Sequence, residues 1–154
     1  MKVGFTGTRE GLTTKQDLAL YELLDKLRPK ECHHGDCIGA DAAFHGNLTL
    51  AGDLSAGKEY ARIVIHPNLS QASRAFCRGD EVRPPKLPLE RNRDIVDETD
   101  ILVACPKQMV EPKDPREGGG TWATVRYARK LRRPIYIILR DGRVLTENVN
   151  RVAA

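Results

Sequence analysis

Short, largely apolar runs recur along this chain, and a segment with helical periodicity separates each run from the next. The five runs lie at 2–6, 32–34, 62–65, 101–105 and 135–139. Strands that are apolar on both faces are typical of a parallel sheet with helices on both sides, because both faces are then buried. The pattern therefore predicts an α/β fold: a three-layer, Rossmann-like arrangement around a mostly parallel, five-stranded sheet.

The first helix is expected directly after the first strand, over 14–28. Thr14 and Asp17 resemble a capping box at its start, and Pro29 ends it. Its buried side is expected to carry four residues: Leu18, Tyr21, Leu24 and Leu27.

Further helices are expected over 40–52 and 89–98. The segment 68–88 holds Pro84, Pro85 and Pro88, which exclude a regular helix there. Near the end of the sequence, a tight turn at 141–142 leads into a short strand around Val144.

The composition suits one globular domain spanning 1–154. No apolar run approaches the roughly 20 residues that a membrane-spanning helix needs, and no signal-peptide pattern is seen, so a cytoplasmic protein without a membrane partner is expected. Lys and Arg exceed Asp and Glu, 25 against 21, which suits an anionic ligand. Only 5% of residues are aromatic, so a nucleic-acid partner is not favoured.

The basic residues are densest near the end of the glycine-turn helix described below. This cluster is interpreted as a solvated helix end, where cations complement the helix dipole. Its members are Arg126, Arg129, Lys130, Arg132 and Arg133.

The four cysteines fit no disulfide framework. Cys32-His33-His34 with Cys37 suggests zinc, but no second ligand pair follows at a known spacing, so no metal is expected. One of the two histidines is expected to be buried and hydrogen-bonded. Cys105 ends an apolar run and is expected to be a buried small residue.

A glycine-rich turn is the clearest functional signal. Gly118-Gly119-Gly120-Thr121 follows the apolar run 101–105 and opens a helix in which apolar residues recur from Trp122. The first backbone N–H groups of a helix lack internal partners, and the helix dipole is positive there. Glycines allow a phosphate to approach that backbone, and Thr121 adds a hydroxyl, so the turn predicts a phosphorylated ligand. Trp122 is expected either to stack on a base or to be buried.

A second glycine-containing turn follows the first strand. Gly7-Thr8-Arg9 comes at the carboxyl end of that strand, where ligands of open parallel sheets bind. The guanidinium of Arg9 could hold a phosphate through two hydrogen bonds. Arg91 is interpreted similarly, and Asn92 as a partner of a base, a ribose or a loop carbonyl.

Four segments, taken in order and spacing, resemble the SLOG superfamily. They are Phe5-Thr6-Gly7-Thr8-Arg9, His34-Gly35-Asp36 through Gly39-Ala40-Asp41, Glu90-Arg91-Asn92-Arg93, and Gly118-Gly119-Gly120-Thr121. That superfamily includes the lonely-guy phosphoribohydrolases, the DprA-type DNA-processing proteins and the molybdenum-cofactor carriers, and the chain looks most like its small YspA-like branch.

The resemblance implies strand order 3-2-1-4-5 and a nucleotide-derived ligand at the glycine motifs. The matching positions are Gly7, Thr8, Arg9, Gly35, Asp36, Arg91, Asn92, Gly118, Gly119, Gly120 and Thr121.

One departure concerns catalysis. The phosphoribohydrolases carry a catalytic Glu three residues after the motif Thr, where this chain has Thr124, and Glu117 replaces the first motif Gly. A transition state with positive charge on a ribosyl carbon needs a nearby carboxylate. Asp36 or Asp41 could supply it. Asp36 lies in a glycine-flanked turn, whereas Asp41, in the first turn of a helix, also suits the helix dipole.

These observations leave three hypotheses. The leading one is a sensor or carrier that binds a nucleotide or a nucleotide-derived ligand, with no further cofactor required. The first alternative is an enzyme that cleaves an N-glycosidic bond in a nucleotide or an ADP-ribose-like molecule. The second is a DprA-like nucleic-acid binder. A homodimer or a higher oligomer is compatible with each.

Overall fold

The computed structural model describes residues 1–53 and 61–149 of the chain, and within them seven strands form one sheet. The strands are β1 (Lys2–Gly7), β2 (Glu31–His34), β3 (Arg62–Ile65), β4 (Glu81–Val82), β5 (Ile101–Cys105), β6 (Ile135–Ile138) and β7 (Val144–Glu147). The helices are α1 (Thr14–Leu27), α2 (Ala40–Asp53), α3 (Pro88–Asp97) and α4 (Gly119–Lys130), with a short 3-10 helix η1 (Gln71–Ser73).

The strand order is β4-β3-β2-β1-β5-β6-β7. Only β7 runs antiparallel to its neighbour; the other pairs are parallel. The five central strands, β3-β2-β1-β5-β6, confirm the expected order, and β7 confirms the strand expected around Val144.

β4 was not expected from the sequence. Its two residues pair with Val64 and Ile65 of β3, and Pro84-Pro85 follow after Arg83. A two-residue strand is too short to produce a periodic pattern, so the sheet has seven strands where five were predicted.

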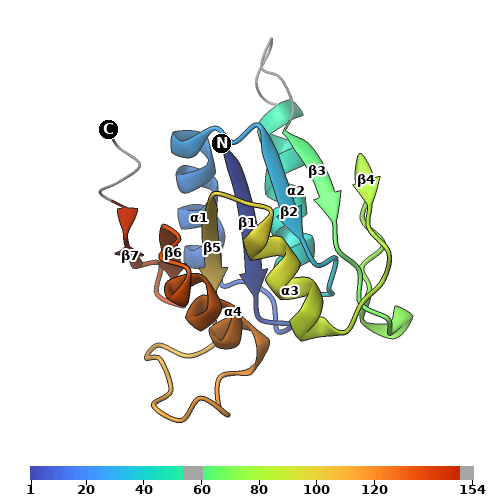
Figure 1. The fold of residues 1–154 in the computed structure, drawn as a ribbon. Helices are drawn as coiled ribbons and strands as arrows, with labels where there is room; N and C mark the ends of the chain where they lie inside the picture. Colours follow the sequence, from blue (N-terminus) through green and yellow to red (C-terminus); the bar gives the residue numbers. More distant parts are fainter. Residues whose placement is uncertain (54–60, 150–154) are drawn as a thin grey trace.

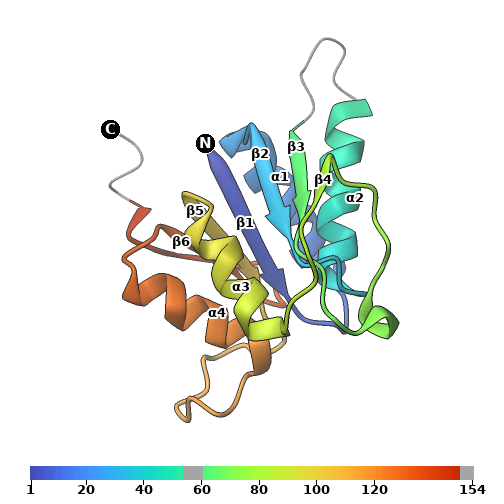
Figure 2. The same cartoon turned by 45° about the vertical axis from the view of Figure 1, so that its right-hand side comes forward.

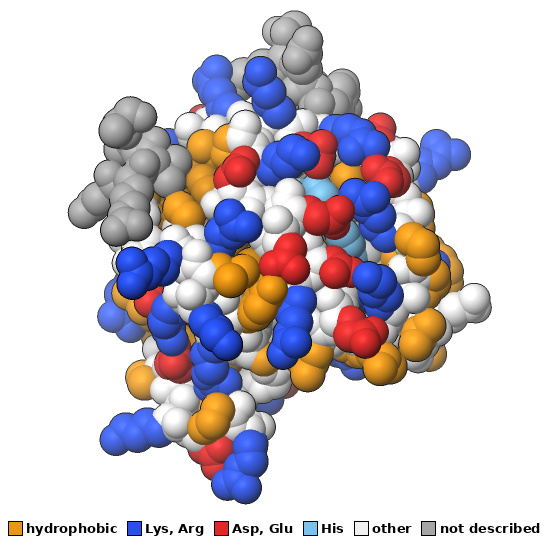
Figure 3. Space-filling view, viewed as in Figure 1, with side chains coloured by type: hydrophobic (Ala, Val, Ile, Leu, Met, Phe, Trp, Pro, Cys, Tyr) orange, Lys and Arg blue, Asp and Glu red, His pale blue; other side chains and the backbone are white. Residues whose placement is uncertain are grey.

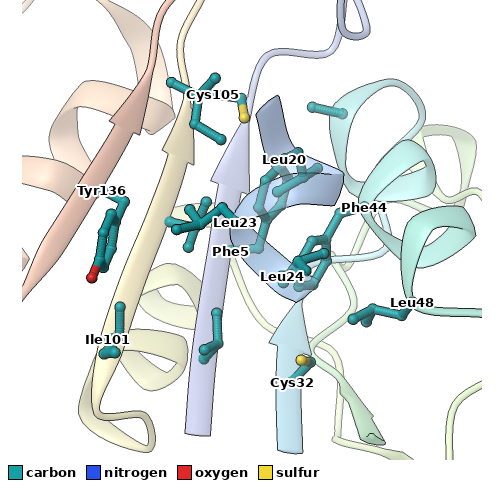
Figure 4. Packing of buried hydrophobic residues seen from close by; sticks show 14 of the residues in the cluster. Phe5, Leu20, Leu23, Leu24, Cys32, Phe44, Leu48, Ile101, Cys105 and Tyr136 are labelled. Atoms are coloured by element: carbon teal, nitrogen blue, oxygen red, sulfur yellow. The ribbon is translucent and has the colours of Figure 1, made fainter. Parts of the chain in front are cut away.

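Helices cover both faces of the sheet, as Figure 1 and Figure 2 show: α1 and α2 lie on one face, and α3 and α4 lie on the other. Each face has its own apolar core. On the first, Phe5 of β1 stacks on Phe44 of α2 at 4.3 Å between ring centroids (Figure 4). On the second, Trp122 and Val125 of α4 pack with Val96 of α3 against β5 and β6. Three layers follow from strands that are apolar on both faces.

α1 begins at Thr14 as expected, but its capping box lies one residue earlier than predicted. Thr13 is the N-cap and forms the capping box with Gln16, instead of Thr14 with Asp17. Leu24 is buried as expected, with Leu20 and Leu23 beside it, and these three point toward the sheet in Figure 4. Of the other expected residues, Tyr21 and Leu27 are half-buried and Leu18 is 59% exposed. Gln16 is fully buried because its amide donates to the carbonyls of Pro106 and Ile138.

The order in which the chain adds strands to the sheet reverses at β1. The chain proceeds from β1 to β2 and β3 on one side, and β5 and β6 lie on the other. At such a switch point the two connecting loops leave in opposite directions and open a crevice at the carboxyl ends of the strands. The starts of α3 and α4 lie at this same edge (Figure 1). Among the described residues, no helix combines the length and the apolar character that crossing a bilayer requires.

Candidate functional site

A cleft with a volume of about 540 Å³ opens outside the carboxyl ends of β1 and β5. Five parts of the chain meet there: the end of β1 with its following loop, the start of α2, the start of α3, the residues after β5, and the start of α4. The lining residues are Phe5, Thr6, Gly7, Thr8, Arg9, Glu10, Cys37, Asp41, Pro88, Leu89, Arg91, Asn92, Lys107, Gln108, Gly118, Gly119, Gly120 and Thr121. The cleft thus brings together nine of the eleven predicted ligand-binding residues, from both glycine turns.

The glycine-rich turn forms the N-terminus of α4. Gly118 is the N-cap with φ 89°, and Gly119 follows with φ 63°, both in the left-handed region that favours glycine. No side chain caps this end, and Gly118 to Thr121 line the cleft, so the first N–H groups of the helix lie beside the cleft without a side-chain cap. A Cβ on Gly120 would come no closer than 3.5 Å, to Asn92 Nδ2. The protein packing therefore has room for a side chain at Gly120, and its absence leaves the helix end open to a ligand.

The loop after β1 is fixed by backbone hydrogen bonds on both sides. The Thr8 N–H donates to the Cys105 carbonyl at the end of β5 (3.1 Å), and the Thr8 carbonyl accepts from Ala40 N at the start of α2 (3.0 Å). A Cβ on Gly7 would lie 2.5 Å from that of Ala40, so glycine is what allows α2 to approach. Thr8 is thereby held at the switch point of the sheet.

Arg9 extends from this loop with an exposed side chain. It makes no hydrogen bond or ion pair with any other residue in the described part of the chain, so its guanidinium is available to a ligand. A second cation, Lys107, forms an ion pair with Glu10 at 2.9 Å. Both partners of that pair line the cleft and are more than half exposed, so the pair contributes little to stability.

Arg91, in the first turns of α3, also lines the cleft, and its side chain is buried. Its Nη1 donates to the carbonyls of Gly35 (2.8 Å) and His66 (2.9 Å), and its Nε donates to Asn92 Oδ1 (2.7 Å). Its Nη2 lies 3.1 Å from Cys37 Sγ. Arg91 is thus a fixed positive charge, anchored to the loops after β2 and β3.

Asp41 is the buried carboxylate of the cleft. Its Oδ2 accepts a hydrogen bond from Cys37 N (3.0 Å), which ties the loop before α2 to the first turn of that helix. Burial raises the pKa of Asp41 to about 6, against the lowering effects of Arg91 and of the Cys37 N–H. A carboxyl with such a pKa can exchange a proton near neutral pH. Asp41 could therefore take part in proton transfer as well as stabilise the helix dipole.

Gly35 and Asp36 do not line the cleft. Asp36 is fully buried with φ 56°; its carboxylate accepts from Arg74 Nε (2.9 Å) and from Cys77 N (2.8 Å). It therefore anchors the segment 74–77 beneath the β2–α2 turn. Gly35 serves the cleft indirectly, since a Cβ there would lie 2.6 Å from the Arg91 guanidinium.

Thr124 does not face the cleft. It is buried, and its hydroxyl donates to the Gly120 carbonyl one turn earlier in α4 (2.7 Å). It lines a separate, smaller pocket between α3 and α4 with residues such as Tyr127 and Arg93. The carboxyl groups that do line the cleft are those of Asp41 and Glu10.

Two arginines of the basic cluster at the end of α4 form ion pairs and hydrogen bonds with other parts of the chain, where a solvated helix end was expected. Arg129 forms ion pairs with Glu111 (2.7 Å) and Glu147 (2.8 Å). Arg126 donates to the carbonyls of Pro112 and Pro115. These two arginines hold the loop between β5 and α4, which ends in the glycine turn. Sequence reasoning missed this because both acidic partners are distant along the chain.

Several cleft residues were not predicted: Glu10, Cys37, Pro88, Leu89, Lys107 and Gln108. Lys107 and Gln108 come soon after β5, and this position at a strand end was the available signal. Gln108 accepts a hydrogen bond from Trp122 Nε1 (3.0 Å), and Trp122 is otherwise buried in the core. The burial alternative for Trp122 is thus confirmed, and the side chain does not line the cleft.

The cysteine and histidine residues of β2 point to opposite faces of the sheet. Cys32 packs in the core beneath α1 and α2, and His34 contacts Phe44 of α2. His33 contacts His66 on the other face. Because successive side chains of a strand alternate, His33 and His34 cannot share one metal ion. Both histidines are buried and hydrogen-bonded, where one was expected to be, and Cys105 is buried as predicted.

The fold and the cleft define a Rossmann-like α/β protein with a crevice at the switch point of its sheet. No protein-family model matches this chain, and no curated protein does. Several solved structures resemble it, and two of them show the extent of the likeness. One is an X-ray structure of the structural-genomics target TM1055, with a TM-score of 0.58 and 14% identity, covering 87% of this chain and 71% of that one.

The other is the molybdenum cofactor binding protein from the phototrophic bacterium Rippkaea orientalis. Its TM-score is 0.60 at 17% identity, and the match covers 90% of this chain and 76% of that one. At these identities the two likenesses establish the fold.

Proposed function

We propose that this chain is a SLOG-type sensor or carrier that binds a nucleotide or a nucleotide-derived phosphorylated ligand in the cleft. The observation that carries the proposal is the N-terminus of α4, which faces the cleft without a side-chain cap and begins with Gly118-Gly119-Gly120. Such an end offers N–H donors and positive potential to a phosphate. The guanidinium of Arg9, which has no partner among residues 1–53 and 61–149, lines the same cleft and adds charge-assisted hydrogen bonds.

Other residues that line the cleft suit the base and the sugar of such a ligand. Leu89, 55% exposed, and Pro88 give one wall apolar surface against which a base or another flat ring can pack. Asn92 and Gln108 supply amide groups nearby. A structural neighbour that is named for binding the molybdenum cofactor supports the use of this fold for binding a small-molecule ligand.

One observation favours a second function, cleavage of an N-glycosidic bond. Asp41 is a buried carboxyl that lines the cleft, with a pKa raised to about 6 by burial. A carboxyl of this kind can act as a general acid or base, or can stabilise a positively charged sugar. The position where the phosphoribohydrolases carry their catalytic Glu holds Thr124, which does not line the cleft. The binding function therefore stands first.

Native mass spectrometry of the protein purified from cells would detect a retained ligand and count the subunits. Calorimetric titration with AMP, ADP-ribose and adenosine would then separate the contribution of the phosphate to the affinity from that of the nucleoside. We expect AMP or ADP-ribose to bind and adenosine to bind at least tenfold more weakly, because adenosine lacks the phosphate. Equal affinity for adenosine and AMP would refute the phosphate site at α4.

A further inference from the structure

Three side chains from different elements converge on the sheet face that α3 covers. They are His33 of β2, His66 just after β3, and Glu98 just after α3. His33 Nδ1 lies 2.8 Å from His66 Nε2, and His66 Nε2 lies 3.4 Å from Glu98 Oε2. One ligand-type atom from each residue lies within 4.8 Å of the others. The three residues are far apart in sequence, so the fold alone brings them together.

The spacing approaches that of a tetrahedral metal site. Bonds of roughly 2.0–2.1 Å to zinc place neighbouring ligand atoms about 3.3 Å apart. The His66–Glu98 separation of 3.4 Å already fits this value. The His33–His66 separation of 2.8 Å must open by about half an ångström. A small rotation of either imidazole achieves this.

The hydrogen-bond partners of His33 and Glu98 resemble those of residues that ligate a metal. Glu31 Oε1 lies 2.7 Å from His33 Nε2; a carboxylate only accepts, so Nε2 carries the proton and the Nδ1 lone pair points toward His66 and Glu98. Arg83 Nη2 holds Glu98 Oε1 at 2.8 Å and leaves Oε2 facing the histidines. A carboxylate behind a ligating histidine, and a hydrogen bond on a ligating carboxylate, are recurring partners of bound metals.

The site is accessible from one side. His33 and His66 are 1% and 2% exposed, whereas the side chain of Glu98 is 37% exposed. Figure 3 shows histidine surface among acidic and basic side chains on this face, near the β2–β3 side of the sheet. An ion could therefore enter past Glu98, and water could fill a fourth coordination position.

A second cluster, His34, His45 and Cys77, lies on the opposite face and is less suited to a metal. The Asp36 N–H donates to His34 Nδ1 (3.0 Å), so that nitrogen is an acceptor and the neutral ring carries its proton on Nε2. That proton is directed at His45 Nδ1 (3.0 Å). The nitrogen of His34 that faces its cluster therefore carries the proton. In His33 the proton lies on the opposite nitrogen, and the Nδ1 lone pair faces His66, which is itself a proposed ligand of the ion.

We propose that His33, His66 and Glu98 bind one divalent transition-metal ion of the Zn²⁺ type, with Glu31 orienting His33. Two imidazoles and one carboxylate suit Zn²⁺ and its neighbours better than Mg²⁺ or Ca²⁺, which prefer oxygen ligands. The ion links β2, the end of β3 and the end of α3. Because α3 also carries Arg91 and Asn92, the ion holds the helix that forms one wall of the cleft.

The test is calorimetric titration of the full chain with ZnCl₂, after chelator treatment and dialysis. We expect one Zn²⁺ per wild-type chain and a rise in the unfolding temperature on addition of zinc. Glu31→Gln should keep the stoichiometry and weaken affinity by about 10–100-fold, the range for partners behind a ligand. His66→Ala and Glu98→Ala should lose stoichiometric binding.

Glu98→Ala keeps the test informative if His66→Ala does not fold, because Glu98 is part-exposed and lies just beyond α3. His45→Ala is the matched control and should bind zinc like the wild type. Circular dichroism of each variant without metal establishes that it is folded. The proposal is overturned by a wild-type chain that binds no zinc stoichiometrically, by unchanged affinity in Glu98→Ala, or by loss of binding in His45→Ala.

Discussion

The carbonyl oxygen of Gly35 accepts a hydrogen bond from Arg91 Nη1 at 2.8 Å, and the missing side chain of Gly35 makes room for the same guanidinium. The two residues are 56 positions apart in sequence. Gly35 does not line the cleft, yet it determines where one of the cleft's cations lies. A glycine in a predicted ligand-binding motif can thus act by fixing the position of an arginine.

Gly35→Ala should lower the free energy of unfolding by roughly 1–3 kcal/mol, the usual cost of overpacking, because the added Cβ would lie 2.6 Å from the Arg91 guanidinium. Displacement of Arg91 should also weaken ligand binding. Urea unfolding and calorimetry measure the two effects. Gly46→Ala in α2 is the control, since a Cβ there meets nothing within 4 Å. Equal stability of the two variants would contradict the steric role of Gly35.

Gly120→Val should abolish binding of a phosphorylated nucleotide and leave the fold intact. The structure has room for the added Cβ, but the branched side chain would cover the N–H groups at the start of α4. Calorimetry and circular dichroism of the variant decide this. Gly46→Val introduces the same side chain in α2, away from the cleft, and should bind the nucleotide with the affinity of the wild type. Undiminished affinity in Gly120→Val would remove α4 as the phosphate site.

Arg9→Ala should weaken binding by roughly 1.5–3 kcal/mol, the range for hydrogen bonds to a charged group. Arg129→Ala removes an equal charge outside the cleft and should not change affinity. Because Arg129 pairs with Glu111 and Glu147, its loss should instead lower the free energy of unfolding by up to about 1 kcal/mol. If both variants bind alike, Arg9 does not contact the ligand.

Asp41 should make stability depend on pH. Burial raises its pKa to about 6 in the folded chain from 3.8, so the folded state holds the proton more tightly. The stabilisation by this proton is fully present below pH 3.8 and is lost as the pH rises through about 6. Relative to Asp41→Asn, the wild type should lose on the order of 3 kcal/mol between pH 4 and 7. Urea unfolding of both proteins over this range measures the difference; a constant difference would mean that Asp41 is not desolvated.

Wild-type protein should release little or no adenine from AMP, because Thr124 stands where the phosphoribohydrolases carry Glu. Thr124→Glu should not create activity: the side chain is buried, does not line the cleft, and would place a carboxylate in the smaller pocket beside Tyr127. Chromatographic assay of free adenine tests both proteins. Robust wild-type turnover that disappears in Asp41→Asn would establish the glycosidase alternative instead.

The central sheet could be predicted because its strands are buried on both faces and therefore apolar throughout. The strand order came from the resemblance, and the structure confirms it for β3-β2-β1-β5-β6. β4 could not be predicted, because its two residues take their conformation from pairing with β3. The buried face of α1 was shifted because Gln16 is buried by hydrogen bonds to the distant carbonyls of Pro106 and Ile138.

The location of the cleft was predictable from glycine turns at strand ends, but the roles of its residues were not. Whether Asp36 or Asp41 faces the cleft depends on which carboxylate Arg74 and the Cys77 N–H engage, and these partners lie 38 and 41 residues from Asp36. Likewise, Arg91 and Arg9 are both arginines beside polar residues in the sequence. Only tertiary contacts show that the first is bonded to the protein.

That difference between Arg91 and Arg9 has a consequence for selectivity. Arg91 loses its rotamer freedom when the chain folds, because the carbonyls of Gly35 and His66 hold it, so a ligand that contacts it incurs no further ordering cost there. Arg9 has no such partners in the described chain and must be ordered by each ligand anew. The cleft therefore has one rigid wall and one adaptable wall. We expect it to reject ligands that differ on the Arg91 side and to accommodate those that differ on the Arg9 side.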